Sequence, residues 1–166
     1  MSSVITVPPA GTPLRVVLDT NVVMAFWHFC DPKLLSLLGW LRAREAVLLT
    51  RSECLIELER VLAYRQFGIA PEKQVEVLAA VRAASECLPD PTEEQMAAAT
   101  ALPRCKDRDD QKFLQLAWEG DAQLLITRDK MLLALNRRPM YRERLQIVTP
   151  ERLIKSLVEA GELAPA

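Results

Sequence analysis

The chain has 166 residues, with 21 Lys and Arg against 22 Asp and Glu, so its formal net charge is −1. Half of the residues are apolar and 26% are charged, a composition that excludes a disordered or collagen-like chain and fits one compact domain. The near-neutral charge argues against a generally basic surface for nucleic acid. The four cysteines form no Cys-x-x-Cys pair, which indicates a reduced protein without a zinc knuckle.

The N-terminal segment is rich in proline and glycine. We expect a flexible leader over residues 1–13, one domain over 14–157 and a C-terminal tail over 158–166. The leader lacks the basic and apolar regions of a signal peptide, and no later stretch approaches the roughly 18 apolar residues of a membrane span. We therefore expect a cytoplasmic protein with no membrane partner.

Short apolar runs then alternate with longer segments of helical period, which predicts an α/β fold with a parallel sheet. The predicted strands are 14–18, 46–49, 124–127 and 145–148. The predicted helices are 52–64, 71–84, 92–101 and 107–118. Thr50 and Glu53 have the spacing of a capping box at the start of the first of these helices.

Two of the predicted strands are followed by an aspartate. Asp19 comes directly after 14–18, and Asp129 comes two residues after 124–127. Either residue alone is explained as a helix N-cap, since Asp is favoured there. As a pair they are more informative, because ligands of open parallel sheets bind outside the carboxyl ends of the strands.

The apolar stripe of the helix 52–64 selects a third acid. Glu57 lies at the edge of this stripe, between Cys54 and Val61, so it needs a partner for its charge. A metal ion is one such partner, and an ion pair with Arg60 or Arg65 is the alternative.

The helix 107–118 contains the fourth candidate acid. Asp110 shares a face with Phe113 and Leu114, which predicts that it points toward the sheet. Asp107 is better placed as a helix cap and is kept in reserve, and Asp109 is predicted to be solvated.

Four carboxylates in one pocket repel one another unless cations neutralise them. Oxygen ligands suit one or two Mg²⁺ or Mn²⁺ ions, and such ions promote hydrolysis of phosphodiesters. The sequence has no phosphate-binding Gly-rich loop, and its only histidine, His28, lies in an aromatic stretch and is predicted to pack. The predicted site therefore consists of Asp19, Glu57, Asp110 and Asp129.

Four segments resemble, in the same order, the motifs of the PIN domain family. They are LDTNV at 18–22, ELERVL at 57–62, DRDDQKFLQLA at 107–117 and ITRDK at 126–130. The resemblance implies a three-layer α/β/α sandwich with a central parallel sheet and a Mg²⁺- or Mn²⁺-dependent endoribonuclease. It assigns metal-ligand roles to Asp19, Glu57, Asp110 and Asp129, and it places Asn21 and Thr127 beside them to orient these groups.

The end of the domain, around residues 147–150, is similar to the branch of this family that supplies the toxins of toxin–antitoxin pairs, the VapC-like endoribonucleases. That resemblance implies an RNA substrate, a cognate antitoxin and a homodimer. RNA contacts are expected from basic residues after the fourth motif, with a merely solvated surface as the alternative. These residues are Arg128, Lys130, Arg137, Arg138, Arg142 and Arg144.

Apolar and aromatic residues elsewhere are predicted to form core. The segment 34–41 is expected to be buried, with a dimer surface as the alternative. Trp27, Trp40 and Trp118 offer flat rings for stacking bases, but helical spacing favours the core for them too.

Two other functions stay open at this point. A phosphohydrolase of the haloacid-dehalogenase type also places an Asp after its first strand, but it needs a second Asp two residues later, where this chain has Asn21. A non-catalytic PIN-like module would use the same pocket to bind RNA or a protein. Fold similarity alone does not decide between binding and catalysis.

Overall fold

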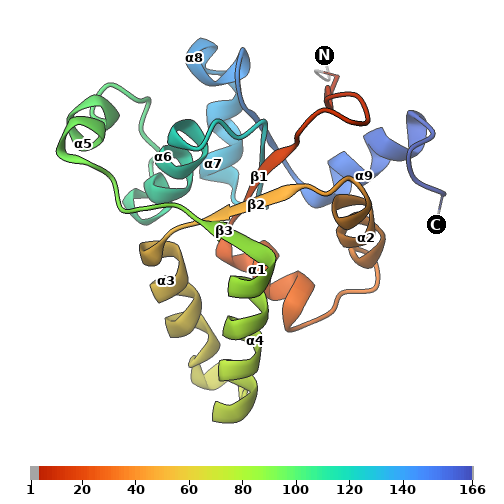
Figure 1. The fold of residues 1–166 in the computed structure, drawn as a ribbon, viewed down its shortest axis with the longest axis vertical. Coiled ribbons are helices and arrows are strands. Elements are labelled where there is room, and N and C mark those ends of the chain that lie inside the picture. The colour runs from red at the N-terminus through yellow and green to blue at the C-terminus, as the bar shows by residue number, and fades with distance from the viewer. Residues whose placement is uncertain (1–3, 166) are drawn as a thin grey trace.

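The computed structural model describes residues 4–165 and contains a five-stranded sheet (Figure 1). The strand order is β3-β2-β1-β4-β5, and every neighbouring pair is parallel. The strands are β1 Arg15–Leu18, β2 Val47–Thr50, β3 Ser85–Cys87, β4 Leu124–Ile126 and β5 Gln146–Val148. The predicted α/β fold with a central parallel sheet is confirmed.

Helices form most of the crossover connections that parallel neighbouring strands require. The α-helices are α1 Thr20–Trp27, α2 Leu35–Ala43, α3 Ser52–Leu62, α4 Pro71–Ala84, α5 Glu93–Ala99, α6 Gln111–Glu119, α7 Lys130–Ala134, α8 Pro139–Arg142 and α9 Pro150–Glu159. Short 3₁₀ turns lie at η1 Arg65–Phe67, η2 Arg108–Asp110 and η3 Leu135–Arg137.

The alternating side chains of the strands build a core on each face of the sheet. Val16 and Leu18 of β1 pack into a cluster with residues of α1, α2 and α9. Val17 points to the other face and packs with residues of α6, α7 and α8. A third cluster, which includes Met24 of α1 and Leu58 of α3, joins α1 to the α3–α4 hairpin that extends from the sheet (Figure 1).

The four predicted helices do not include α1, α2, α7, α8 or α9, and the structure differs from the prediction at three further places. β3 was not predicted, because its sequence Ser-Glu-Cys is polar and it pairs with β2 alone, at the edge of the sheet. The helix predicted at 107–118 begins instead as the 3₁₀ turn η2, and α6 starts at Gln111. The capping box at Thr50 was wrong: Thr50 ends β2, and Arg51 is the N-cap of α3 without a side-chain cap.

The apolar segment 34–41 is core, as expected. Five of its side chains are at most 6% exposed, namely those of Leu34, Leu37, Leu38, Trp40 and Leu41. Segments near both ends of the chain contact this region: the Arg44 guanidinium donates to the Pro8 carbonyl at 2.7 Å, and the Trp40 indole donates to Glu162 at 3.1 Å. Over residues 4–165, no helix is both long enough and apolar enough to cross a membrane.

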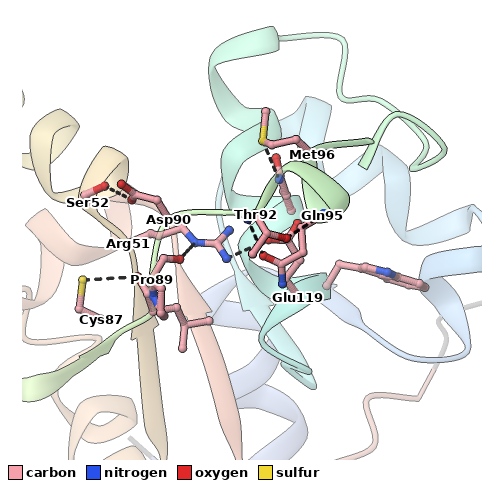
Figure 2. Close-up of polar contacts among 12 residues, drawn as sticks. Arg51, Ser52, Cys87, Pro89, Asp90, Thr92, Gln95, Met96 and Glu119 are labelled. Carbon is pink, nitrogen blue, oxygen red and sulfur yellow. Dashed lines mark hydrogen bonds and ion pairs between the residues drawn. The ribbon is translucent and has the colours of Figure 1, made fainter. Parts of the chain in front are cut away.

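A buried ion pair follows β2. The Arg51 side chain is 4% exposed, and its guanidinium lies 2.8 Å from a carboxylate oxygen of Glu119, which is 9% exposed (Figure 2). The Nε of Arg51 also donates to the Pro89 carbonyl at 2.9 Å. Arg51 thereby ties the end of β2 to α6 and to the segment that follows β3. Its charge is balanced by a carboxylate inside the protein.

Candidate active site

The strand order reverses direction between β1 and β4, at the centre of the sheet. β1 leads outward to β2 and β3 on one side, and β4 leads to β5 on the other. In open α/β sheets a ligand crevice forms at such a switch point, outside the carboxyl ends of the strands. Asp19 follows β1 directly, and Thr127 and Asp129 follow β4, so these three residues lie where a ligand is expected.

Asp19 is held rigidly in this position. One carboxylate oxygen accepts from the Val22 amide at 2.9 Å, which makes Asp19 the N-cap of α1, and the other accepts from the Thr127 hydroxyl. The side chain is almost completely buried. Burial raises the pKa of Asp19, and Asp129 and Glu57 raise it further, while its hydrogen bonds with Thr127 and Val22 lower it.

Asp129 lies beside Asp19 and shares the same threonine. It is the N-cap of α7, and one of its oxygens accepts from the amides of Met131 and Leu132 at 2.7 and 3.1 Å. Its own amide donates to the Thr127 hydroxyl oxygen at 2.9 Å. The fully buried Thr127 therefore contacts both aspartates and orients them relative to each other.

Glu57 approaches the same place from α3. The Thr20 hydroxyl donates to one of its carboxylate oxygens, and the Lys112 ammonium lies 3.1 Å from the other. Lys112 also donates to the Asp109 carbonyl at 2.6 Å, so it is held by α6 and the turn before it. The ion pair that we considered for Glu57 does exist, but its partner is Lys112 rather than Arg60 or Arg65.

Asp110 lies at the junction of η2 and α6. Desolvation raises its pKa to about 7, and the negative charges of Asp129, Asp107, Asp19 and Glu57 add to that rise. Asp107 caps η2 by accepting from the Asp109 amide at 3.0 Å. The structure thus directs Asp110 into the cavity and uses Asp107 as a cap, the arrangement expected from the helix faces.

These acids line one cavity of about 290 Å³. Its walls also include Thr20, the exposed Asn21, and the aromatic residues Tyr64 and Phe67. The acids are Asp19, Glu57, Asp110 and Asp129. We refer to this space as the acidic cavity.

The donor set of the acidic cavity fits a hard divalent cation. Its charged groups are all carboxylates, and the raised pKa of Asp110 reflects negative charge that a cation would offset. The oxygens do not yet converge: within residues 4–165, no three His, Cys, Asp or Glu side chains form a preformed metal cluster. Thr20 and Lys112 hold Glu57, and backbone amides hold Asp129.

The basic residues expected to contact RNA divide into two groups. Arg128 pairs with Glu151, and Arg144 pairs with Asp121 at 2.5 Å while lying 3.9 Å from the Trp118 ring centroid. The second group is exposed, and none of its members forms an ion pair within the described residues; it consists of Lys130, Arg137, Arg138 and Arg142.

Sequence reasoning missed Thr20 and Lys112, the two residues that hold Glu57. Thr20 carried a signal, because it directly follows a candidate ligand and starts a helix. Lys112 carried a weaker one, because it lies two residues after Asp110 and its contact spans 55 positions of sequence.

Comparisons with known proteins bear on the family and the fold of the chain. A sequence model of the PIN domain matches residues 15–131. The crystal structure of VapBC2 from Rickettsia felis bound to a DNA fragment from their promoter contains a chain with a TM-score of 0.59 and 15% identity, covering 82% of this chain and 98% of that one. PAE2754 from Pyrobaculum aerophilum gives a TM-score of 0.55 at 18% identity, covering 88% and 96%. Curated proteins give no significant match.

Proposed function

This chain belongs to the PIN domain family, and from that premise we propose that it is a Mg²⁺- or Mn²⁺-dependent endoribonuclease and the toxin of a toxin–antitoxin pair. The observation that carries the proposal is that four carboxylates from four separate segments line one cavity at the switch point of the sheet. Asp19, Glu57, Asp110 and Asp129 would hold one or two ions. A bound ion would supply Lewis-acid activation of the phosphodiester and of the attacking water.

The protein's own residues orient three of these carboxylates, those of Asp19, Asp129 and Glu57. The Thr127 hydroxyl donates to Asp19 and accepts from the backbone of Asp129, so one buried side chain sets the relative position of two acids. Thr20, at the start of α1, donates a hydrogen bond to Glu57 and so orients that carboxylate. Such supporting hydrogen bonds fix ligand orientation before any ion arrives. Asn21 lines the cavity, where its amide is placed to contact a water or a phosphate oxygen.

Two features support a phosphodiester substrate. The carboxylate set is suited to divalent ions, and the cavity offers no histidine to activate a serine or cysteine nucleophile, because His28 is the only histidine and does not line it. In addition, Arg137 and Arg138 are exposed and form no ion pair within residues 4–165, so they are free to bind phosphates of an RNA that extends beyond the cavity. We assign Lys130 and Arg128 to the same surface, although Arg128 must then exchange its pairing with Glu151 for RNA.

We further propose two protein partners. A chain of similar fold is part of a VapBC2 complex, and we extend a partner of that kind, a small antitoxin, to this protein. An antitoxin that covers the acidic cavity would exclude substrate and offset its negative charge with a basic side chain. A homodimer in the cytoplasm completes the proposal.

Cleavage of a mixed pool of structured RNA by the purified protein tests the function. The assay includes Mg²⁺, Mn²⁺ or EDTA, and it compares the wild type with Asp19→Asn and Asp129→Asn. We expect cleavage that requires metal and both aspartates. A matched DNA pool tests the choice of RNA.

Two results would contradict the nuclease proposal. If folded, antitoxin-free wild type cleaves nothing with either metal, the non-catalytic binding module becomes the better account. If both variants cleave as well as the wild type, the site lies elsewhere or the activity is a contaminant.

A further inference from the structure

Two aromatic residues line part of the acidic cavity. Tyr64 and Phe67 line the same space as the four carboxylates, and they follow α3 in the short turn around η1. Neither ring donates to, accepts from or screens a carboxylate in the chemistry described above. Their position therefore needs a separate explanation.

The geometry of the cluster is that of a supported platform. The rings of Tyr64 and Phe67 are stacked, with centroids 6.1 Å apart and an angle of 21° between their planes. Phe29, from the end of α1, packs edge-on against Phe67 at 5.6 Å. Phe67 also packs against the buried cluster of α1, α3 and α4. The platform is thus anchored through Phe67 and rigid on one side.

The outer ring of the platform is open. Tyr64 is 42% exposed, and in the part of the chain that is described Phe67 is the only ring that it contacts. An aromatic ring fixed on one face and open on the other presents a flat surface to a second planar group. Tyr64 is not part of the buried cluster of α1, α3 and α4, so its ring is not needed to fill that core.

The location next to the carboxylates indicates which planar group fits. A polynucleotide entering the cavity brings phosphates toward four acids, and these repel it. A neutral ring adds affinity there without adding charge, because every nucleobase has a π-face and stacking does not depend on phosphate contacts. A base within a duplex is already stacked on both sides, so only an unpaired base is free to bind in this way.

We propose that Tyr64, supported by Phe67, stacks on an unpaired nucleobase next to the scissile phosphodiester. The inference rests on the proposed nuclease function and adds to it a residue that contacts a base rather than a phosphate. Phe29 packs edge-on against Phe67 and supports the platform from behind. Tyr64 and Phe67 line the cavity, so a base stacked on Tyr64 would lie beside the carboxylates.

The test uses an RNA whose cleavage position has been mapped with the wild type. 2-Aminopurine, whose fluorescence falls when it stacks, replaces the base on either side of the scissile bond. Binding is measured in Ca²⁺ under conditions where no cleavage is seen, with wild type, Tyr64→Phe, Tyr64→Leu and Tyr64→Ala. Val75→Ala, at an exposed apolar residue of α4 outside the cavity, is the matched control. Thermal unfolding confirms that each variant is folded.

We expect wild type, Tyr64→Phe and the control to quench the probe on one side of the bond. Tyr64→Leu and Tyr64→Ala should lose the quenching and bind about tenfold more weakly or worse. Cleavage of the same sequence in a duplex should be at least about tenfold slower than in a loop.

Two outcomes overturn the inference. If wild type cleaves the RNA but Tyr64→Leu quenches and binds equally well, stacking is excluded while the nuclease function stands, and the aromatic cluster is left for a protein partner. If wild type neither binds nor cleaves any RNA, the proposed function fails and this inference fails with it.

Discussion

The ends of β1 and β2 lie side by side in the sheet, but the buried charge that follows each strand is neutralised to a different extent. β2 runs into Arg51, whose buried guanidinium is paired with Glu119 and bonded to the Pro89 carbonyl (Figure 2). β1 runs into Asp19, which is as deeply buried but has only neutral donors on its two oxygens. The first site is balanced within the protein, and the second is not.

The difference teaches where to look for function. A buried charge is costly unless a partner offsets it, so a protein that keeps several unbalanced acids at one place leaves room for a partner from outside. Among residues 4–165, the only basic side chain that forms an ion pair with any of the four acids is Lys112, at Glu57. We interpret the balanced site as structural and the unbalanced site as functional.

Neutralising one carboxylate at each site should separate the two roles most strongly. Asp19→Asn should lower RNA cleavage by at least about a thousandfold, equivalent to about 4 kcal/mol, because a site ligand loses its charge. Glu119→Gln should leave cleavage per folded molecule within about threefold. Single-turnover rates, corrected for the folded fraction, measure both. Equal losses of cleavage rate in the two variants would show that the two sites do not differ in function.

Breaking the balanced pair should cost stability. Arg51→Met leaves Glu119 buried without its cation, and we expect a loss of about 3–5 kcal/mol in the free energy of unfolding. Adding Glu119→Leu should recover much of that loss, because the uncompensated charge is gone. Urea unfolding of the single and double variants checks this. A loss below about 1 kcal/mol in Arg51→Met would show that the pair is not structurally important.

At the acidic cavity, removing a charged side chain should instead increase the free energy of unfolding. The pKa of Asp110 is about 7 in the folded chain against 3.8 for a free aspartate, so the folded state binds more protons between these values. Without metal, stability should therefore fall as pH rises from about 4 to 7 and stay low above it.

Asp110→Asn removes this penalty. Because Asp110 is partly exposed, we expect a gain of only roughly 1 kcal/mol at pH 8, or about 2–4 °C in Tm, and a smaller gain at pH 5. Thermal unfolding in EDTA at both values measures it. A destabilised Asp110→Asn at pH 8 would argue against excess negative charge in the cavity.

Arginines with and without an ion-pair partner can also be compared, and here we expect a smaller effect on RNA binding. Arg144 is paired with Asp121, whereas Arg137 and Arg138 form no ion pair in the described chain. Reversing Arg137 and Arg138 to Glu should weaken RNA binding by about tenfold or less and reduce its dependence on salt. Unchanged salt dependence would remove this surface from the proposed RNA path.

The sequence predicted the fold where residues follow a period. The apolar runs at β1, β2, β4 and β5 were found because each strand is covered on both faces. β3 was not predicted because an edge strand of Ser, Glu and Cys has no apolar pattern. Its position is set by pairing with β2. The beginning of α3 was misjudged because Thr50 is used by the sheet, a tertiary effect that local capping rules do not include.

The four acids of the candidate site could be predicted because strand ends and helix faces follow local sequence patterns. The residues that hold these acids could not, because they depend on tertiary packing. The positions of Asp19 and Asp129 follow from strand ends, and those of Glu57 and Asp110 from helix faces, so the structure brings all four to one cavity. The partners Thr20 and Lys112 depend on how α1 and α6 pack against α3, which no local pattern encodes. The platform of Tyr64 and Phe67 depends on the turn after α3 in the same way.

Calorimetric titration with Mn²⁺ tests the central claim most directly. Metal-free wild type should bind Mn²⁺, the Asp19→Asn/Asp129→Asn double variant should lose that binding, and Glu119→Gln should retain it. Binding should also raise the Tm of the wild type, by an amount that grows with Mn²⁺ concentration. Mn²⁺ binding that persists unchanged in the double variant would contradict the account, because the unbalanced acids would then not be the metal site.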